Sequence, residues 1–263
     1  MSSGSTRLQV VQVKAIPPGT DEYENQRAAI LGRLALKVPS DLVLPSSLIA
    51  DPPNDVSNIP NTCGLLTDRE IDITEDYNAV NLAHAIASKE LTAVEVTTSF
   101  AKRAIIAHQL TCCLTQWFMD EALQRAKELD EYLHKHGKPI GPLHGVPISI
   151  KEHIPVAGTF SSQGSLSSTV FNEKDSLMVE ILREAGAVFY CKTNQPQAIM
   201  HLESTSHYGR TLNPFNLKLS AGGSTGGEAA LLAMKGSVLG VGTDIGGSVR
   251  GPTSRTWTFS YVS

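Results

Sequence analysis

The chain lacks several features that would place it in a specialised class of protein. Its 263 residues contain no run of about 18 apolar residues, the length that a membrane-spanning helix needs. The formal net charge of −4 gives no electrostatic reason to expect nucleic acid or an anionic membrane as a partner. Residues 1–12 also lack the charged-then-apolar design of a secretory signal, so a cytoplasmic location is expected.

Patterns typical of metal sites are also missing. The four cysteines are Cys63, Cys112, Cys113 and Cys191, and no two of them form a C-x-x-C pair. Adjacent Cys112 and Cys113 do not suit a structural zinc site, and the histidines of the second half have no i, i+4 spacing. We therefore expect reduced, mostly buried thiols and no bound metal.

What the chain does contain is typical of a soluble globular protein. Apolar residues make up 41% and charged residues 18%, and the length suits one domain or at most two. Prolines interrupt the first 75 residues every few positions. We interpret residues 1–75 as an extended arm that wraps the domain and carries short helices, such as one over residues 23–36.

Helical patterns begin after this arm. Val80, Ala83 and Ile86 recur at the spacing of an amphipathic helix. Thr92 followed by Glu95 forms a capping box, which predicts the start of a second helix that runs through residue 105. A third helix is expected over residues 119–134, ending before a glycine at position 137.

From residue 141 onward, strand and helix patterns alternate. Short β-branched or apolar runs predict strands over residues 146–150, 187–191 and 237–241. Amphipathic segments predict helices over residues 175–185 and 228–234. Strands separated by helices indicate an α/β fold with helices packed on a sheet.

The most informative segment is glycine-rich and runs over residues 220–252. It places two glycine-flanked serines, Ser224 and Ser248, 24 residues apart. Gly246 and Gly247 before Ser248 would bring consecutive backbone N–H groups around one point, which suits an oxyanion hole for a serine nucleophile. Two ordinary glycine-rich turns are the plainer interpretation, and the spacing excludes a Walker A loop.

A rival catalytic interpretation treats Ser224 as the nucleophile of an α/β hydrolase. Residues 222–226 fit G-x-S-x-G, but that fold places its histidine after the serine, and the last histidine here is His207. The segment at residues 216–221 also makes a poor strand. Without a later histidine the base must be another group, and Lys151 directly follows an apolar strand. A lysine that reaches solvent at the strand end is the plainer alternative.

At this point the motifs resemble those of a known family. Residues 222–252 contain Gly-Gly-Ser-Thr-Gly-Gly-Glu and Gly-Thr-Asp-Ile-Gly-Gly-Ser-Val-Arg, which resemble the signature of the amidase signature family. The run Gly-Pro-Leu-His-Gly-Val-Pro-Ile-Ser-Ile-Lys-Glu at 141–152 is similar to the lysine segment of that family, and Lys192-Thr-Asn and Asn213-Pro214 also match. The likeness covers residues 74–252, and the arm resembles that of fungal acetamidase-like members.

The resemblance implies a Ser–cisSer–Lys triad and an acyl-enzyme intermediate, without an organic cofactor. Ser248 would be the nucleophile, Ser224 would follow a cis peptide bond and relay the proton, and Lys151 would be the general base. The implied substrate is a small amide, which is hydrolysed to an acid and ammonia or an amine. The implied fold is a mixed central sheet with helices on both faces, and the family allows a homodimer.

The same resemblance assigns supporting residues. Backbone N–H groups of four consecutive residues would hold the oxyanion, namely Ile245, Gly246, Gly247 and Ser248. Asp244 and Arg250 would brace their loop, and a plain surface ion pair is the alternative. Ile199 sits where the family contacts the acyl group of its substrate, although core packing explains it equally well. Thr225 keeps a hydroxyl where the family has a second serine.

One departure from the family pattern leaves three alternatives open. Residues 76–252 would be the N-terminal part of the amidase signature domain, and residues 253–263 match none of the sequence that follows in the family. We therefore expect a chain truncated after the signature, without the C-terminal half of the domain. The alternatives are a catalytically inactive fragment, an amidotransferase-type subunit, and an esterase that uses a distant histidine near Ser224.

Overall fold

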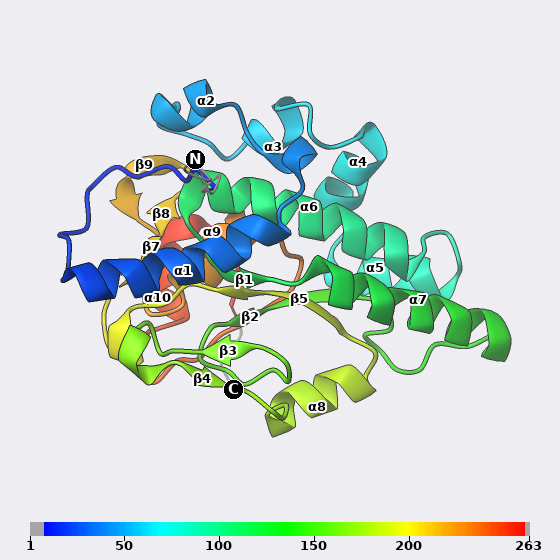
Figure 1. Ribbon diagram of the computed structural model, residues 1–263. Coiled ribbons are helices and arrows are strands. Elements are labelled where there is room, and N and C mark those ends of the chain that lie inside the picture. Colours follow the sequence, from blue (N-terminus) through cyan, green and yellow to red (C-terminus); the bar gives the residue numbers. More distant parts are fainter. Residues whose placement is uncertain (1–7, 261–263) are drawn as a thin grey trace, which may run out of the picture.

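A four-stranded mixed sheet forms the centre of the protein (Figure 1). The computed structural model describes residues 8–260, so residues 1–7 of the predicted arm and 261–263 of the predicted tail lie outside it. The strand order is β1-β5-β2-β10. β2 pairs in parallel with β5 and β10, and β1 runs antiparallel to β5. The strand bounds are Leu114–Trp117 for β1, Pro147–Lys151 for β2, Val188–Thr193 for β5 and Gly240–Val241 for β10.

Ten α-helices and three small hairpins surround this sheet within the described residues. The helices are α1 Asp21–Lys37, α2 Ser46–Ala50, α3 Ile59–Thr62, α4 Asp68–Asp76, α5 Ala79–Ala87, α6 Ala93–Thr111, α7 Met119–His136, α8 Leu177–Glu184, α9 Gly226–Ala233 and α10 Arg250–Thr256. The hairpins pair β3 Phe160–Ser161 with β4 Val170–Phe171, β6 Thr205–Ser206 with β7 Gly209–Arg210, and β8 Leu212–Asn213 with β9 Asn216–Ser220. None of these helices is long and apolar enough to cross a membrane.

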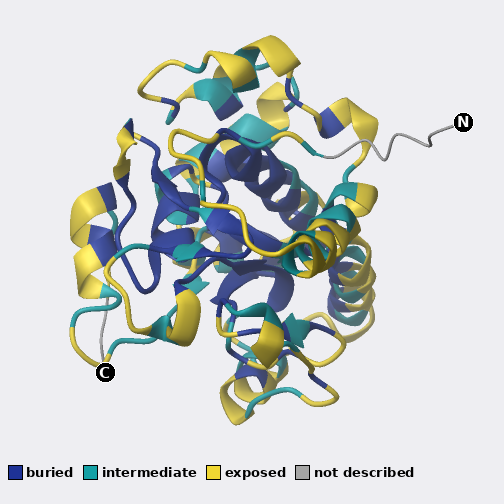
Figure 2. Ribbon diagram, turned by 60° about the vertical axis from the view of Figure 1, so that its left-hand side comes forward, coloured by how far each residue is buried: buried dark blue, intermediate teal, exposed yellow. Residues whose placement is uncertain are grey.

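The long helix α6 is the most deeply buried helix (Figure 2). It begins at the predicted capping box, in which the Thr92 N–H donates to Glu95 Oε2 at 2.9 Å and the Glu95 N–H donates back to Thr92 Oγ1 at 3.1 Å. The predicted stop of α7 is confirmed as well, since Gly137 ends it in the left-handed conformation. These local signals therefore set the ends of two helices that support the sheet.

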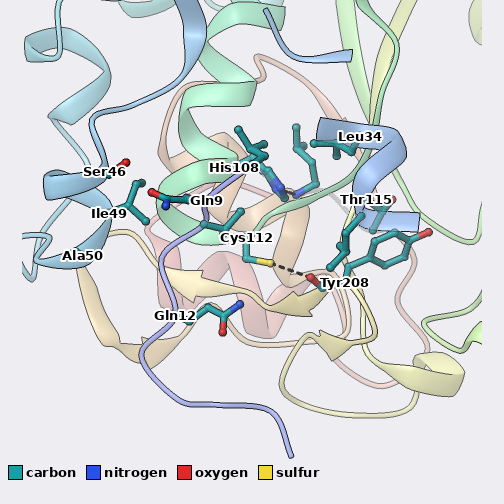
Figure 3. Close-up of a pocket in the computed structure, with 14 residues that line it drawn as sticks. Gln9, Gln12, Leu34, Ser46, Ile49, Ala50, His108, Cys112, Thr115 and Tyr208 are labelled. Carbon is teal, nitrogen blue, oxygen red and sulfur yellow. Dashed lines mark hydrogen bonds between the residues drawn. The ribbon is translucent and has the colours of Figure 1, made fainter. Parts of the chain in front are cut away.

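The N-terminal segment packs onto α6 and β1 rather than standing apart (Figure 1). Its α1 covers the predicted helix at 23–36, and Leu42, Leu44 and Val56 join the main core. A cavity of about 730 Å³ remains between this segment and the end of α6 (Figure 3). Its walls include His108 and Cys112 at the end of α6 and Ile49 of α2. The boundary between the arm and the domain, expected after residue 75, stays a prediction. Helix α4 continues across that position to Asp76.

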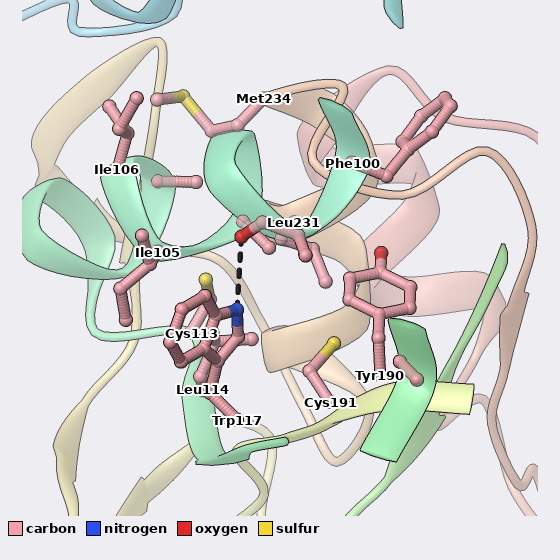
Figure 4. Packing of buried hydrophobic residues seen from close by; sticks show 14 of the residues in the cluster. Phe100, Ile105, Ile106, Cys113, Leu114, Trp117, Tyr190, Cys191, Leu231 and Met234 are labelled. Carbon is pink, nitrogen blue, oxygen red and sulfur yellow. Dashed lines mark hydrogen bonds between the residues drawn. The ribbon is translucent and has the colours of Figure 1, made fainter. Parts of the chain in front are cut away.

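Helices cover both faces of the sheet, as the sequence analysis expects. Side chains alternate along β5, so Val188 and Tyr190 join α6, α7 and α9 in the larger core (Figure 4). Phe189 faces the other way and packs with Ile148 of β2 and Val179 of α8. The two clusters thus lie on opposite sides of one sheet. Each side chain of β2 therefore faces one cluster or the other.

Two expectations for individual elements need correction. Residues 216–220 form strand β9, although their sequence makes a poor strand, because pairing with β8 and burial of Leu217 stabilise them. The strand expected over 237–241 shortens to Gly240–Val241. Residues 238 and 239 form a bend in place of the expected strand, in which the Ser237 hydroxyl donates to Leu239 O at 3.0 Å and Ser237 Oγ lies 2.8 Å from Ser149 Oγ.

Candidate active site

Lys151 ends the central strand β2 with its side chain fully buried. Because side chains alternate along a strand, Lys151 and Ser149 share the face of the sheet that α9 covers. Ser149 Oγ donates to Glu228 Oε2 of α9 at 2.5 Å, which anchors that helix to the strand. The β2–α9 packing therefore brings the lysine next to the loop that precedes α9.

The ammonium group of Lys151 is surrounded by hydroxyl groups. Its Nζ donates to Ser224 Oγ at 2.6 Å, to Thr225 Oγ1 at 2.9 Å and to Thr243 Oγ1 at 3.1 Å. Within residues 8–260 the lysine has no carboxylate at ion-pair distance. Burial lowers the pKa of Lys151 to about 8, against the opposing charges of Glu228 and Asp244. A fraction of these lysines is therefore neutral and able to accept a proton near neutral pH.

Ser224 is buried and lies at the start of the turn into α9. The peptide bond that joins Gly223 to Ser224 is cis. Gly223 leaves no space for a side chain, because a Cβ there would overlap backbone atoms of residues 201–203. Tight backbone packing thus holds Ser224 in the position where its hydroxyl meets Lys151.

The loop that carries Ser248 is organised by Asp244. The Asp244 carboxylate accepts the N–H groups of Gly247 at 2.6 Å, Val249 at 3.0 Å and Arg250 at 3.2 Å. The Arg250 guanidinium adds two more hydrogen bonds, at 2.9 and 3.0 Å. The Arg250 side chain and these N–H groups hold the pKa of the Asp244 carboxyl well below its usual range. Asp244 is thus ionised at any working pH and fixes the loop.

Ser248 is joined through its main chain to the loop that carries Ser224. The Thr225 N–H donates to Ser248 O at 3.0 Å, so the two glycine-rich loops are hydrogen-bonded to each other next to Ser224. The Ser248 hydroxyl itself has no hydrogen-bond partner in the described part of the chain and is half-buried. It remains available to an incoming group.

The four N–H groups expected to form an oxyanion hole differ in their partners. Gly247 donates to Asp244, whereas the N–H groups of Ile245, Gly246 and Ser248 have no partner among residues 8–260. The Ile245 side chain is 91% exposed. Three N–H groups are therefore free to bind an oxygen, in a loop whose residues Ile245 and Gly246 are exposed.

Glu228 is a buried acidic residue that the sequence analysis did not single out. Its carboxyl accepts hydrogen bonds from Ser149 at 2.5 Å and from Thr193 at 2.8 Å. Burial raises the pKa of Glu228 to about 7, although both hydrogen bonds and the charge of Lys151 oppose this shift. Thr243, a further partner of Lys151, was also missed. Both lie within the glycine-rich segment, which is the only signal that the sequence offers for them.

The remaining predicted residues lie near the same end of the sheet. Lys151 is paired in register with Thr193 of β5, and the turn at Gln197–Ile199 follows that strand. Ile199 is half-buried there and has no hydrogen bond to Lys151, Ser224 or Ser248. No histidine among residues 8–260 is hydrogen-bonded to Ser224 or Ser248, so the alternative of an esterase with a histidine near Ser224 has no support. This part of the chain also contains no cluster of metal-ligating side chains.

Comparisons with known proteins show which family the chain is similar to. Residues 95–259 match the family model described as Amidase, and the match ends within the segment expected to diverge. The chain is 48% identical to an "Amidase" of Gibberella moniliformis and 45% identical to an "Acetamidase" of Emericella nidulans. These alignments cover 85% and 88% of this chain, but only 44% and 42% of the relatives. The chain thus spans less than half of their length.

Solved structures show the same fold. A structure titled "Fatty acid amide hydrolase" superposes with a TM-score of 0.80 at 42% identity, over 88% of this chain and 41% of that one. A peptide amidase from Stenotrophomonas maltophilia superposes with a TM-score of 0.62 at 28% identity, over 68% of this chain and 38% of that one. The family match, the close relatives and the shared fold together establish that this chain belongs to the amidase signature family.

Proposed function

We propose that this chain hydrolyses the C–N bond of a small carboxylic amide, with Ser248 as nucleophile, Ser224 as proton relay and Lys151 as general base. The observation that carries this proposal is the 2.6 Å hydrogen bond between Lys151 Nζ and Ser224 Oγ inside a buried site. A lysine serves as a base only where its surroundings lower its pKa, and burial does so here.

The proposed reaction proceeds in two balanced stages. Neutral Lys151 takes the proton of Ser224 while Ser224 takes the proton of Ser248, and the Ser248 oxygen attacks the carbonyl carbon. The C–N bond then breaks, and the proton returns through Ser224 to the leaving nitrogen, which departs as ammonia or an amine. Water attacks the acyl-enzyme by the same route, which releases the acid and restores Ser248.

The negative oxygen that forms during each attack needs hydrogen-bond donors. The free N–H groups of Ile245, Gly246 and Ser248 are suited to this task, while Gly247 holds the loop through Asp244. Removal of one such donor costs about 10²–10³-fold in rate in comparable enzymes. These donors act more strongly in a dry site than in water, because the local dielectric constant is lower.

A catalytically inactive chain is the second candidate, and the exposure of the oxyanion loop favours it. Ile245 is 91% exposed and Gly246 is exposed as well, so this part of the loop is open to water. Release of ammonia from acetamide, propionamide and benzamide by the purified chain distinguishes the two candidates. Turnover that disappears in Ser248→Ala supports hydrolysis. A folded chain that releases no ammonia from any of the three amides supports the inactive alternative.

A further inference from the structure

A second cavity, of about 310 Å³, lies away from the proposed catalytic residues. It is enclosed by α1, by the outer edge strand β1, and by the loop at residues 156–160. Lys151, Ser224 and Ser248 do not line it. Its volume falls near the lower end of the range of small-molecule pockets, about 300–1,000 Å³. The cavity is therefore large enough for a ligand with one ring.

Aromatic residues are enriched in the walls of this cavity. Aromatic residues make up 6% of the whole chain, yet five of them line this one cavity, namely Trp117, Phe118, Phe160, Phe189 and Tyr208. All except Phe160 are buried, so their ring positions are fixed by the surrounding core. Such rigid walls favour a flat apolar ligand body, because stacked and edge-to-face ring contacts need little rearrangement.

Basic side chains also line the cavity. Four basic residues line it, and three of them pair with carboxylates: Lys37 with Glu121 at 3.1 Å, Arg125 with Glu128 at 3.5 Å, and Arg183 with Asp175 at 2.6 Å. The fourth, Arg33 of α1, has no ion pair or hydrogen bond among the described residues. Arg33 thus supplies the one uncompensated positive charge of the cavity within this part of the chain.

The position of Arg33 suits recognition of a carboxylate. Its guanidinium carbon lies 5.2 Å from the centre of the Phe160 ring, so a cation–π contact orients the group over the aromatic wall. A planar guanidinium held in this way can donate two parallel hydrogen bonds to one carboxylate. A single positive charge matches a monoanion better than a dianion such as a phosphate ester.

Polar atoms without partners gather around the same cavity. Buried polar side-chain atoms normally have a hydrogen-bond partner. Among the described residues, nine such atoms lack one, and three of them belong to residues that line this cavity: Thr115, Arg125 and Thr169. Leu34, Thr115 and Tyr208 also line the larger neighbouring cavity, as Figure 3 shows. A polar occupant next to these atoms would explain their concentration here.

From these observations we propose that the cavity between α1 and β1 binds a small aromatic monocarboxylate, with its ring against Phe160 and its carboxylate on Arg33. The proposal does not depend on amide hydrolysis, since none of its residues belongs to the catalytic set. The ligand and the acid that an amidase releases both carry a carboxylate group.

Calorimetric titration of the full chain with phenylacetate at neutral pH tests this proposal. We expect saturable one-site binding with a Kd on the order of 1 mM, as suits a ligand of this size. Arg33→Gln should weaken binding about 10-fold or more, because it removes a charge-assisted hydrogen-bond donor. Arg69→Gln is the matched control, since Arg69 is an exposed arginine on α4; it should bind like the unchanged chain.

Two further ligands and one further variant complete the test. 2-Phenylethanol, the neutral analogue, should bind about 10-fold more weakly than phenylacetate. Lys151→Met should leave phenylacetate binding unchanged, which separates this cavity from the catalytic site. The proposal is overturned by equal binding in Arg33→Gln, by tighter binding of phenyl phosphate, or by no saturable binding up to tens of millimolar.

Discussion

Lys151 Nζ lies 2.6 Å from Ser224 Oγ, although 73 residues separate them in the sequence. The contact forms because the parallel strand β2 ends where the cis Gly223–Ser224 turn enters α9. Neither residue is accessible to solvent. A buried amine bonded to a buried hydroxyl is a direct route for a proton, and the predictions about Lys151 depend on this pair.

The first prediction concerns the pH dependence of activity. Because the pKa of Lys151 is lowered to about 8, roughly a tenth of the chains carry a neutral lysine at pH 7. The rate of Ser248 acylation should therefore rise with pH and reach half of its maximum near pH 8. A pH profile of single-turnover acylation measures this, and a flat profile between pH 6 and 9 would contradict Lys151 as the base.

The second prediction concerns stability. The pKa of Lys151 falls from 10.5, the value of a solvated lysine side chain, to about 8 in the fold, so the unfolded chain binds more protons between these values. The cost of the buried ammonium is full below pH 8 and disappears as the pH rises towards 10.5. The free energy of unfolding of Lys151→Met should therefore exceed that of the unchanged chain by the largest amount below pH 8. Urea unfolding at several pH values measures the difference, and a gain that does not depend on pH refutes the lowered pKa.

The third prediction concerns the loop of the nucleophile. Asp244→Ala removes the acceptor of three backbone N–H groups and should slow acylation by about 10- to 100-fold, since small displacements of a reacting group are costly. Arg250→Gln is the matched control. It loses an ion pair in which the arginine side chain is 60% exposed and the aspartate side chain 2% exposed, but it keeps those three backbone bonds, so its rate should stay within about threefold. Equal rates in both variants would show that the Asp244 bonds to the loop are not needed.

The fourth prediction concerns the contact between the N-terminal segment and the core. The buried Arg103 of α6 donates to Met234 O at 2.7 Å, to Thr74 Oγ1 at 2.8 Å and to Glu75 Oε1 at 2.5 Å. Arg103→Met leaves Met234 O and Thr74 Oγ1 without this donor, whereas Glu75 keeps Asn61 and Lys235 as partners. The loss should cost about 1–3 kcal/mol in the free energy of unfolding for each buried acceptor left without a partner. Equilibrium urea unfolding, followed by tryptophan fluorescence, measures this cost.

A neighbouring lysine provides the control for Arg103. Lys102 pairs with Glu70 at 2.6 Å, but its side chain is 25% exposed. Lys102→Gln should therefore cost less than about 1 kcal/mol, as is usual for ion pairs near the surface. If both substitutions cost the same, burial of Arg103 does not determine its contribution.

Local signals in the sequence predicted six of the ten α-helices and three of the four strands of the central sheet, but neither β1 nor the strands of the small hairpins. The capping box at Thr92 and Glu95 and the stop at Gly137 act over a few residues, so they are visible in the sequence itself. A second box, at Thr67 and Glu70, opens α4 and was overlooked, although it has the same spacing. Strand β9 was missed for a different reason, because its partner β8 and not its own composition stabilises it.

The sequence predicted only those residues of the candidate site that belong to recognisable motifs. Resemblance to the family pointed to Lys151, Ser224 and Ser248, while the hydroxyl of Thr243 and the carboxyl of Glu228 became apparent only in three dimensions. Lys151 meets Thr243 across 92 residues, and no periodicity or spacing reports such a contact. The hydrogen bond from the Gly247 N–H to the Asp244 carboxylate likewise depends on how the loop folds back.

The most direct test of the proposed mechanism identifies the residue that reacts as the nucleophile. The purified chain is labelled with a fluorophosphonate serine probe at neutral pH, and the modified peptide is located by mass spectrometry. We predict one adduct, on Ser248, that is absent from Ser248→Ala and strongly slowed in Lys151→Met. An adduct on Ser224, or labelling at the full rate in Lys151→Met, would contradict the mechanism.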